Sequence, residues 1–123
     1  IGLVPDGGWT AIVPHLIGPG KAAELLLLDP VLDAQTALAV GLVHEVVPDA
    51  QLVERAREVA AGLARGPATA FGGAKALVNG VVLPALEAQL ERERQRIISQ
   101  AATADFREGL SAFVEKRQAK FNA

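Results

Sequence analysis

The stretch Ile1-Gly2-Leu3-Val4-Pro5-Asp6-Gly7-Gly8 decides the fold of this chain, because an apolar run leads directly into a sharp turn. Proline fixes φ and glycine accepts φ values that other residues avoid, so Pro-Asp-Gly-Gly is a strong turn signal. A short helix is predicted to begin near Asp6, since apolar residues then follow at helical spacing: Trp9, Ile12, Val13 and Leu16. The stretch has no basic leader and is not predicted as a signal peptide. Because the chain begins with an apolar segment that leads directly into a turn, we expect it to be a piece of a longer protein.

Turn signals divide the rest of the chain into helices and one strand. Asp33 is predicted to cap a helix that Gly41 ends, and Thr103 is predicted to cap the last helix. Residues 42–47 are rich in β-branched side chains and form the one predicted strand. The other helices are predicted over residues 21–28, from Pro48-Asp49 to Gly66-Pro67, over 68–78 with a stop at Asn79-Gly80, and over 83–101.

The composition excludes several classes of site. A net charge of -2 gives no electrostatic reason to expect nucleic acid as a partner. The absence of cysteine excludes disulfides and thiolate metal sites and fits a reducing compartment, so we expect a cytoplasmic location. His15 and His44 are too far apart in sequence to suggest zinc, and no metal site is predicted. No run of 18 uncharged apolar residues occurs, so no membrane span is predicted.

A set of motifs runs in a consistent order over essentially the whole chain. Residues 1–8 begin the set, and the other segments are Leu16-Ile17-Gly18, residues 23–27, residues 33–37, Gly41-Leu42-Val43, Val46-Val47-Pro48, residues 105–109 and residues 112–117. This ordered set resembles the enoyl-CoA hydratase/isomerase (crotonase) family. Within that family it is most similar to enoyl-CoA isomerases and to isomerases of ring-epoxide phenylacetyl-CoA, a phenylacetate-catabolism activity.

The resemblance implies an α/β spiral of ββα units for the whole protein, with this stretch mostly α-helical apart from one short strand. Residues 1–48 are expected to end the crotonase core and to carry the active-site turn. Residues 49–123 are expected to form a helical region for oligomerisation, as a homotrimer or hexamer, and for CoA contact. The expected substrate is an acyl-CoA thioester, with coenzyme A as part of the substrate and no permanently bound cofactor. The oxyanion hole is expected in the N-terminal half, before Ile1, so the piece alone is expected to be inactive.

Asp6 is the predicted catalytic residue. The resemblance implies that a carboxylate here moves a substrate proton in isomerases or acts as a nucleophile in related dehalogenases. Typical hydratases instead use a pair of glutamates further upstream. A carboxylate on a turn walled by Leu3, Val4 and Trp9 could reach a carbon whose proton moves. The alternative is that Asp6 only caps the following helix, a role that aspartate fills well.

Five further residues are predicted to contact substrate or CoA: Pro5, Gly7, Trp9, Phe113 and Lys116. For Trp9 and Phe113, core or interface packing is the alternative. The resemblance implies that Lys116 reaches a CoA phosphate, although a cation near a helix C-terminus is also ordinary dipole chemistry. Gly109, inside a helix, predicts close packing. The charged run Glu91-Arg92-Glu93-Arg94 is predicted as a solvated face or an intersubunit rim.

The leading hypothesis is therefore an enzyme that shifts a double bond in, or isomerises, a CoA thioester through an enolate, with Asp6 as acid and base. One alternative is an enoyl-CoA hydratase that uses upstream glutamates. Others are a helical oligomerisation fragment without chemistry and a catalytically silent relative. The acyl substrate is not specified by these residues.

Overall fold

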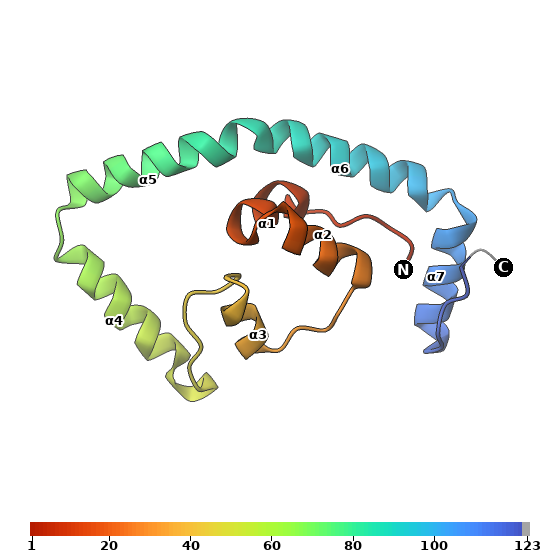
Figure 1. Ribbon diagram of the computed structural model, residues 1–123, viewed down its shortest axis with the longest axis horizontal. Helices are drawn as coiled ribbons and strands as arrows, with labels where there is room; N and C mark the ends of the chain where they lie inside the picture. The colour runs from red at the N-terminus through yellow and green to blue at the C-terminus, as the bar shows by residue number, and fades with distance from the viewer. Residues whose placement is uncertain (122–123) are drawn as a thin grey trace. The chain divides into compact units, whose positions relative to one another are not determined.

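The computed structural model describes residues 1–121, and in this range the regular elements are helices joined by turns (Figure 1). This confirms the prediction of a mostly helical segment. The elements are α1 (Trp9–Ile17), α2 (Pro19–Leu28), α3 (Ala34–Ala39), the 3-10 turn η1 (Asp49–Gln51), α4 (Leu52–Ala64), α5 (Ala68–Val82), the 3-10 turn η2 (Leu83–Ala85), α6 (Leu86–Ala101) and α7 (Ala104–Glu115).

The predicted strand over residues 42–47 is wrong for residues 1–121, where no strand is present. These residues form a bend followed by an irregular connection to η1. A strand is defined by its ladder of hydrogen bonds to a neighbouring strand, so a β-branched segment without such a neighbour is not a strand. The β-branched residues favour an extended backbone, but their sequence does not show whether a neighbouring strand is present.

The predicted stop at Asn79-Gly80 is also wrong, because α5 continues through both residues to Val82. The carbonyl of Asn79 accepts from the amide of Leu83, so the helical pattern extends one turn further. A glycine inside a helix costs about 1 kcal/mol relative to alanine, which is too little by itself to end a helix.

The predicted caps are confirmed. The Asp33 carboxylate accepts from the amide of Thr36 at 2.7 Å, and the Thr103 hydroxyl accepts from the amide of Phe106 at 3.2 Å. Gly41 follows α3 with φ +85°, a left-handed conformation that glycine adopts without a Cβ penalty. The amide of Leu42 then donates to the carbonyl of Ala37 at 2.9 Å, which completes the end of the helix.

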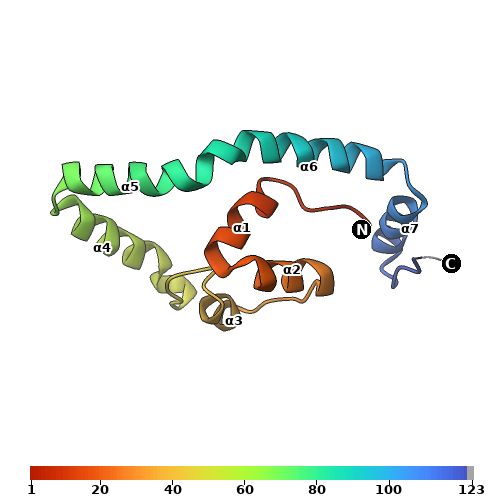
Figure 2. The ribbon, with the colours of Figure 1, turned by 45° about the horizontal axis from the view of Figure 1, so that its top comes forward.

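The chain divides into two compact units. The first unit contains Ile1–Ile12 together with the chain from Ala85 onward, and the second contains Val13–Pro84. In the first unit the N-terminal residues run beside α6 and end near α7, as both ribbon views show (Figures 1 and 2). The predicted functional boundary at residue 48 is a separate matter and stays a prediction.

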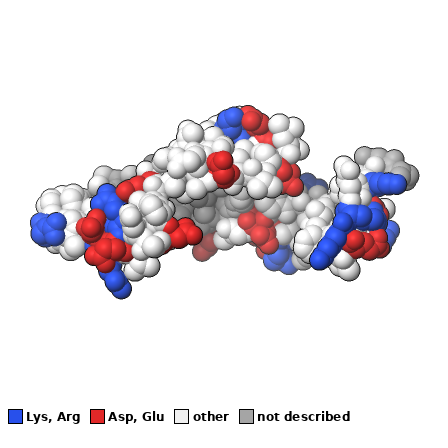
Figure 3. Space-filling view, turned by 90° about the horizontal axis from the view of Figure 1, so that it is seen from below, with Lys and Arg blue, Asp and Glu red and all other residues white. Residues whose placement is uncertain are grey.

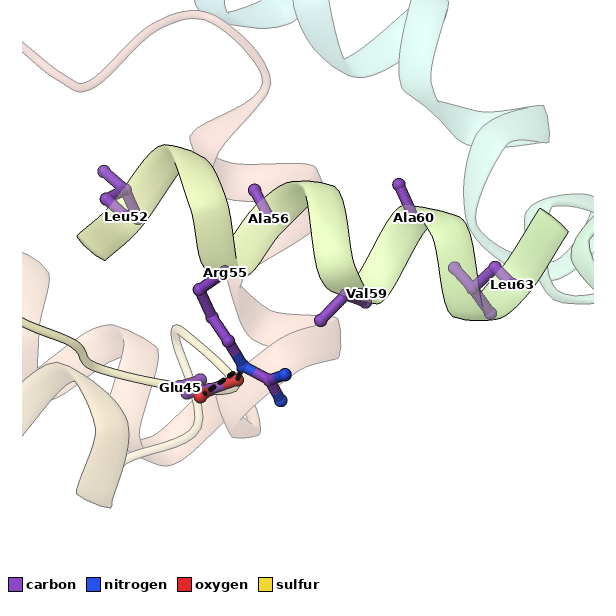
Figure 4. A pocket seen from close by; sticks show the side chains of 7 residues that line it. All are labelled: Glu45, Leu52, Arg55, Ala56, Val59, Ala60 and Leu63. Carbon is purple, nitrogen blue, oxygen red and sulfur yellow. Dashed lines mark hydrogen bonds and ion pairs between the residues drawn. The ribbon is translucent and has the colours of Figure 1, made fainter. Parts of the chain in front are cut away.

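In the second unit an ion pair ties the connection after α3 to α4. Arg55 Nε lies 2.8 Å from Glu45 Oε1, and the two side chains meet beside the helix (Figure 4). Next to this pair is a hollow of about 340 Å³, lined mainly by apolar residues of α4: Leu52, Ala56, Val59, Ala60 and Leu63. One face of α4 is therefore apolar, and it is open to solvent within the described chain.

The core of the described chain is small. Its buried apolar residues are Val13, Ala22 and Ala112, while Leu27 and Leu77 are about four-fifths exposed, at 80% and 77%. Extended exposed apolar surface marks interaction surfaces. The helical stretch Ala68–Ala101 contains an 18-residue window with mean hydropathy 1.3, which is long and apolar enough to cross a membrane. The core helices of water-soluble proteins meet the same two criteria, so the prediction of no membrane span stays a prediction.

Candidate functional site

Asp6 opens a tight turn whose conformation depends on two glycines. The Asp6 carbonyl accepts from the amide of Trp9 at 3.2 Å, which closes the turn three residues on. Gly7 and Gly8, at its centre, have φ +67° and +86°, the sign that a type I′ turn requires at both positions. A Cβ at Gly7 would have open space around it, so only the backbone conformation favours glycine there.

The Asp6 carboxylate is exposed and makes no hydrogen bond or ion pair with another residue in the range 1–121. Leu3, Val4 and Trp9 beside it are half-buried, so the predicted apolar wall does not enclose it within this chain. The structure also gives no support to the alternative that Asp6 caps α1 with its side chain.

Glu93 of α6 caps α1 instead. Its carboxylate accepts from the amide of Gly8 at 2.9 Å and from the amide of Thr10 at 3.0 Å. It also accepts a hydrogen bond from the Thr10 hydroxyl. Gln89, one turn earlier on α6, donates to the same hydroxyl at 2.8 Å. The amides at the start of α1, which have no partner within the helix, thus donate to Glu93. Glu93 lies 85 positions from Gly8 and 83 positions from Thr10 in the sequence.

Glu93 is a buried charge, with only 4% of its surface exposed. Burial acts to raise the pKa of Glu93, but hydrogen bonds from the Thr10 hydroxyl and from the amides of Gly8 and Thr10 outweigh it, so the pKa is lowered. The carboxylate is ionised at neutral pH and places its charge at the positive end of α1. The predicted solvated face or rim is consequently wrong at Glu93, whereas Glu91 and Arg94 are exposed and paired at 2.7 Å.

Sequence reasoning missed Glu93 because its neighbours in sequence are charged. A signal was present all the same. Leu86, Leu90, Glu93 and Ile97 step by 4, 3 and 4 residues, which places Glu93 on the apolar face of α6. A Cβ added to Gly8 would lie 3.0 Å from Leu86 Cδ1, so this face of α6 is the one that the turn contacts. A single carboxylate inside such a face predicts a specific polar partner.

The residues before the turn are held along α6 and α7. The amide of Val4 donates to Gln100 Oε1 at 2.8 Å. A Cβ at Gly2 would lie 2.7 Å from the backbone oxygen of Asp105, and one at Gly109 would lie 2.5 Å from the backbone of Ile1. The close packing predicted at Gly109 is confirmed, and its partner is the N-terminal segment. Asp6 therefore lies midway between two anchored amides, those of Val4 and Gly8.

The other predicted substrate contacts are only partly brought together. Pro5, Gly7 and Trp9 lie in or beside the turn, with Pro5 and Trp9 half-buried. Phe113 is 72% exposed on α7, so core packing within the described chain is ruled out for it. Lys116 ends α7 in a left-handed conformation, φ +54°, and is exposed. No hydrogen bond or ion pair in residues 1–121 joins Phe113 or Lys116 to Asp6, and their roles stay predictions.

A second charged group lies at the end of α7. Arg117 donates to both carboxylate oxygens of Glu108, at 2.6 and 3.0 Å, and the amide of Lys120 donates to one of them at 2.8 Å. The Arg117 hydrogen bonds and the Lys120 amide lower the pKa of Glu108 to about 2. Figure 3 shows acidic and basic groups side by side at this end of the chain. Within residues 1–121 no three His, Cys, Asp or Glu side chains are placed to hold a metal ion.

Comparisons with known proteins agree with this description. The family model described as "Enoyl-CoA hydratase/isomerase" matches residues 1–123. A probable enoyl-CoA hydratase of Rhodobacter capsulatus is 39% identical over 98% of this chain and 47% of its own length. The 1,2-epoxyphenylacetyl-CoA isomerase of Escherichia coli is 36% identical over 98% of this chain and 46% of its own. The crystal structure of an enoyl-CoA hydratase from Mycobacterium avium subsp. paratuberculosis is 37% identical, with a TM-score of 0.87 over all of this chain and 50% of the other. The chain spans about half the length of the curated relatives it matches.

Proposed function

The chain belongs to the enoyl-CoA hydratase/isomerase family, and from that premise we propose that the whole protein shifts a double bond in an acyl-CoA thioester, with Asp6 as the acid and base. Relatives carry the names of both hydratases and isomerases, so the family alone leaves the reaction open. The carboxylate of Asp6, which is exposed and makes no hydrogen bond or ion pair within residues 1–121, is the observation that carries the choice of an isomerase.

The proposed reaction moves one proton and one carbon–carbon double bond. In a 3-enoyl thioester, Asp6 accepts a proton from the carbon next to the carbonyl, and the electron pair becomes an enolate on the thioester oxygen. Hydrogen-bond donors outside this chain would stabilise that oxygen. The protonated Asp6 then gives the proton to the γ-carbon, and the double bond moves to the 2-position. A single carboxylate serves both steps if it reaches both carbons.

This role is supported by the observation that the Asp6 side chain does not cap α1 within residues 1–121. A carboxylate that caps a helix is occupied by backbone amides, but Glu93 already accepts from the amides at the start of α1. The anchored amides of Val4 and Gly8 hold the turn on both sides of Asp6. A base held on a fixed backbone needs little reorganisation before it takes a proton.

Three further features of the whole protein are part of the proposal. Coenzyme A enters as part of the substrate, and no permanently bound cofactor is needed for this chemistry. A homotrimer or hexamer would cover exposed apolar residues of α7 such as Phe113. A chain with no cysteine suits a reducing, cytoplasmic location.

The test is Asp6→Asn in the whole protein. Asparagine keeps the size and the hydrogen-bonding capacity of the side chain but cannot accept the substrate proton. We expect kcat for isomerisation of a 3-enoyl-CoA to fall by about 100-fold or more, with KM little changed. Exchange of substrate protons into heavy water should fall in parallel.

The matched control is Asp49→Asn, which changes another exposed aspartate near the start of a helix. It should leave turnover unchanged. Retained isomerisation and proton exchange in Asp6→Asn would remove Asp6 as the base. Hydration that persists in Asp6→Asn would favour the alternative hydratase with glutamates outside this chain. A whole protein without turnover on any CoA thioester would favour the non-catalytic oligomerisation alternative.

A further inference from the structure

We infer that Glu93 is a positioning residue for catalysis, because it fixes the turn that aims Asp6 at the substrate. The inference rests on the proposed role of Asp6. It assigns to α6 a function in the reaction beyond packing, and it predicts which variants of α6 lower kcat while leaving substrate binding intact.

The first step is the location of the Glu93 bonds relative to Asp6. Gly8 is the second central residue of the turn that Asp6 opens, and its amide donates to Glu93 Oε2 at 2.9 Å. The amide of Thr10, one residue beyond the turn, donates to the other carboxylate oxygen at 3.0 Å. The two oxygens therefore hold the backbone at Gly8 and at Thr10 and fix the direction in which the turn enters α1.

The second step is the lack of a local substitute. The first turn of α1 contains no acidic residue, and the Asp6 side chain makes no hydrogen bond to it within the described chain. Pro5 and the two glycines favour the turn, and the bond from the Trp9 amide to the Asp6 carbonyl closes it, but glycine still permits a wide range of backbone angles. The contact to Glu93 is the long-range polar interaction that anchors this turn to α6.

The third step is the choice of a carboxylate. An ionised Glu93 offers acceptors only, which matches the two amides and the Thr10 hydroxyl that face it. In Glu93→Gln the side-chain NH₂ would face one of these donors, so at least one bond is lost while the size is kept. A buried amide left without an acceptor will move or recruit water, and the turn moves with it.

The experiment compares Glu93→Gln in the whole protein with the same change in the Asp6→Asn background. A misplacement of about 1 Å can lower a rate by up to ~100-fold, and we expect Glu93→Gln to lower kcat by about tenfold with KM within about twofold. In the Asp6→Asn background, Glu93→Gln should lower the residual kcat by less than about twofold, because it acts through Asp6. Glu91→Gln, on the exposed side of the same helix, is the control and should change neither constant.

A second pair of variants keeps the inference testable if Glu93→Gln does not fold. Thr10→Val removes the hydroxyl bond to Glu93 and leaves both amide bonds, whereas Thr10→Ser keeps it. We expect Thr10→Val to lower kcat at unchanged KM. We expect Thr10→Ser to keep kcat near that of the parent protein.

The outcomes separate the two proposals. If Asp6→Asn retains full turnover, the proposed function fails. If Asp6→Asn is slow but Glu93→Gln lowers kcat equally in both backgrounds, the proposed function stands and the positioning role is refuted. A folded Glu93→Gln protein with a lower melting temperature and normal kcat also refutes it, as does equal turnover of Thr10→Val and Thr10→Ser.

Discussion

Replacing Gly109 with alanine should destabilise the protein by overpacking the contact between α7 and the N-terminal segment. The added Cβ would lie 2.5 Å from the backbone carbon and oxygen of Ile1 and 2.8 Å from its Cα. Carbon atoms in contact lie about 3.5–4.0 Å apart, so the segment must shift by about 1 Å. The neighbouring amide of Val4, bonded to Gln100 at 2.8 Å, lies on the same segment and would be strained by that shift.

Two opposing terms set the magnitude. Alanine inside a helix is favoured over glycine by about 1 kcal/mol. Overpacking a tight contact costs about 1–3 kcal/mol. We expect a net loss of roughly 0–2 kcal/mol for Gly109→Ala. Gly62→Ala on α4 is the matched control, because a Cβ there meets nothing within 4 Å, and it should gain up to about 1 kcal/mol.

Urea unfolding of the two variants of the whole protein measures the contrast, which should be about 1–3 kcal/mol at an unchanged m value. Amide hydrogen exchange at Val4 provides a local readout and should accelerate in Gly109→Ala alone. An alanine that stabilises position 109 as much as position 62, with normal exchange at Val4, would refute the reasoning.

Two further predictions concern the end of α7. Lys116→Ala in the whole protein should raise KM for a CoA substrate by an amount worth about 1 kcal/mol, with kcat little changed and the effect shrinking in salt; an unchanged KM would leave Lys116 as a surface cation. Glu108 has a pKa lowered to about 2 by Arg117 and the Lys120 amide, from an ordinary value of 4.5, so its stabilising contribution is complete above about pH 4.5 and is lost as the pH falls toward 2. Melting temperatures of Glu108→Gln and the parent protein should therefore converge over that window, and a constant difference down to pH 2 would contradict the pairing.

Local signals predicted most of the helices correctly. Asp33 and Thr103 each cap a helix through a contact three residues away, so the sequence around them contains both partners. The stop at Asn79-Gly80 was wrong because a single glycine costs a helix only about 1 kcal/mol. The strand at 42–47 was wrong because a β-branched segment forms a ladder only beside another strand, which its own sequence does not supply.

The candidate site shows the same division. The turn at Asp6 could be predicted because Pro5, Gly7 and Gly8 impose it locally. The hydrogen bonds between Glu93 and this turn could not be predicted from the residues next to Glu93, which are charged. Only the helical spacing of α6 places Glu93 on the inward face of the helix. The exposure of Asp6 was also not predicted, because the sequence places apolar residues on both sides of it. In the structure these residues are half-buried and do not close over the carboxylate within this chain.

The contact between Glu93 and the Asp6 turn has a consequence for synthesis on the ribosome. Its hydrogen bonds span 83 and 85 residues, and the bond from Val4 to Gln100 spans 96. While the nascent chain ends within α5, the turn exists without its acceptor on α6. Collapse of a chain of this size takes up to about 100 μs, whereas synthesis adds about 5–20 residues per second, so translation sets the delay. The turn at Asp6 is therefore anchored only after α6 has been synthesised, because residues 8 and 93 lie 85 positions apart in the sequence.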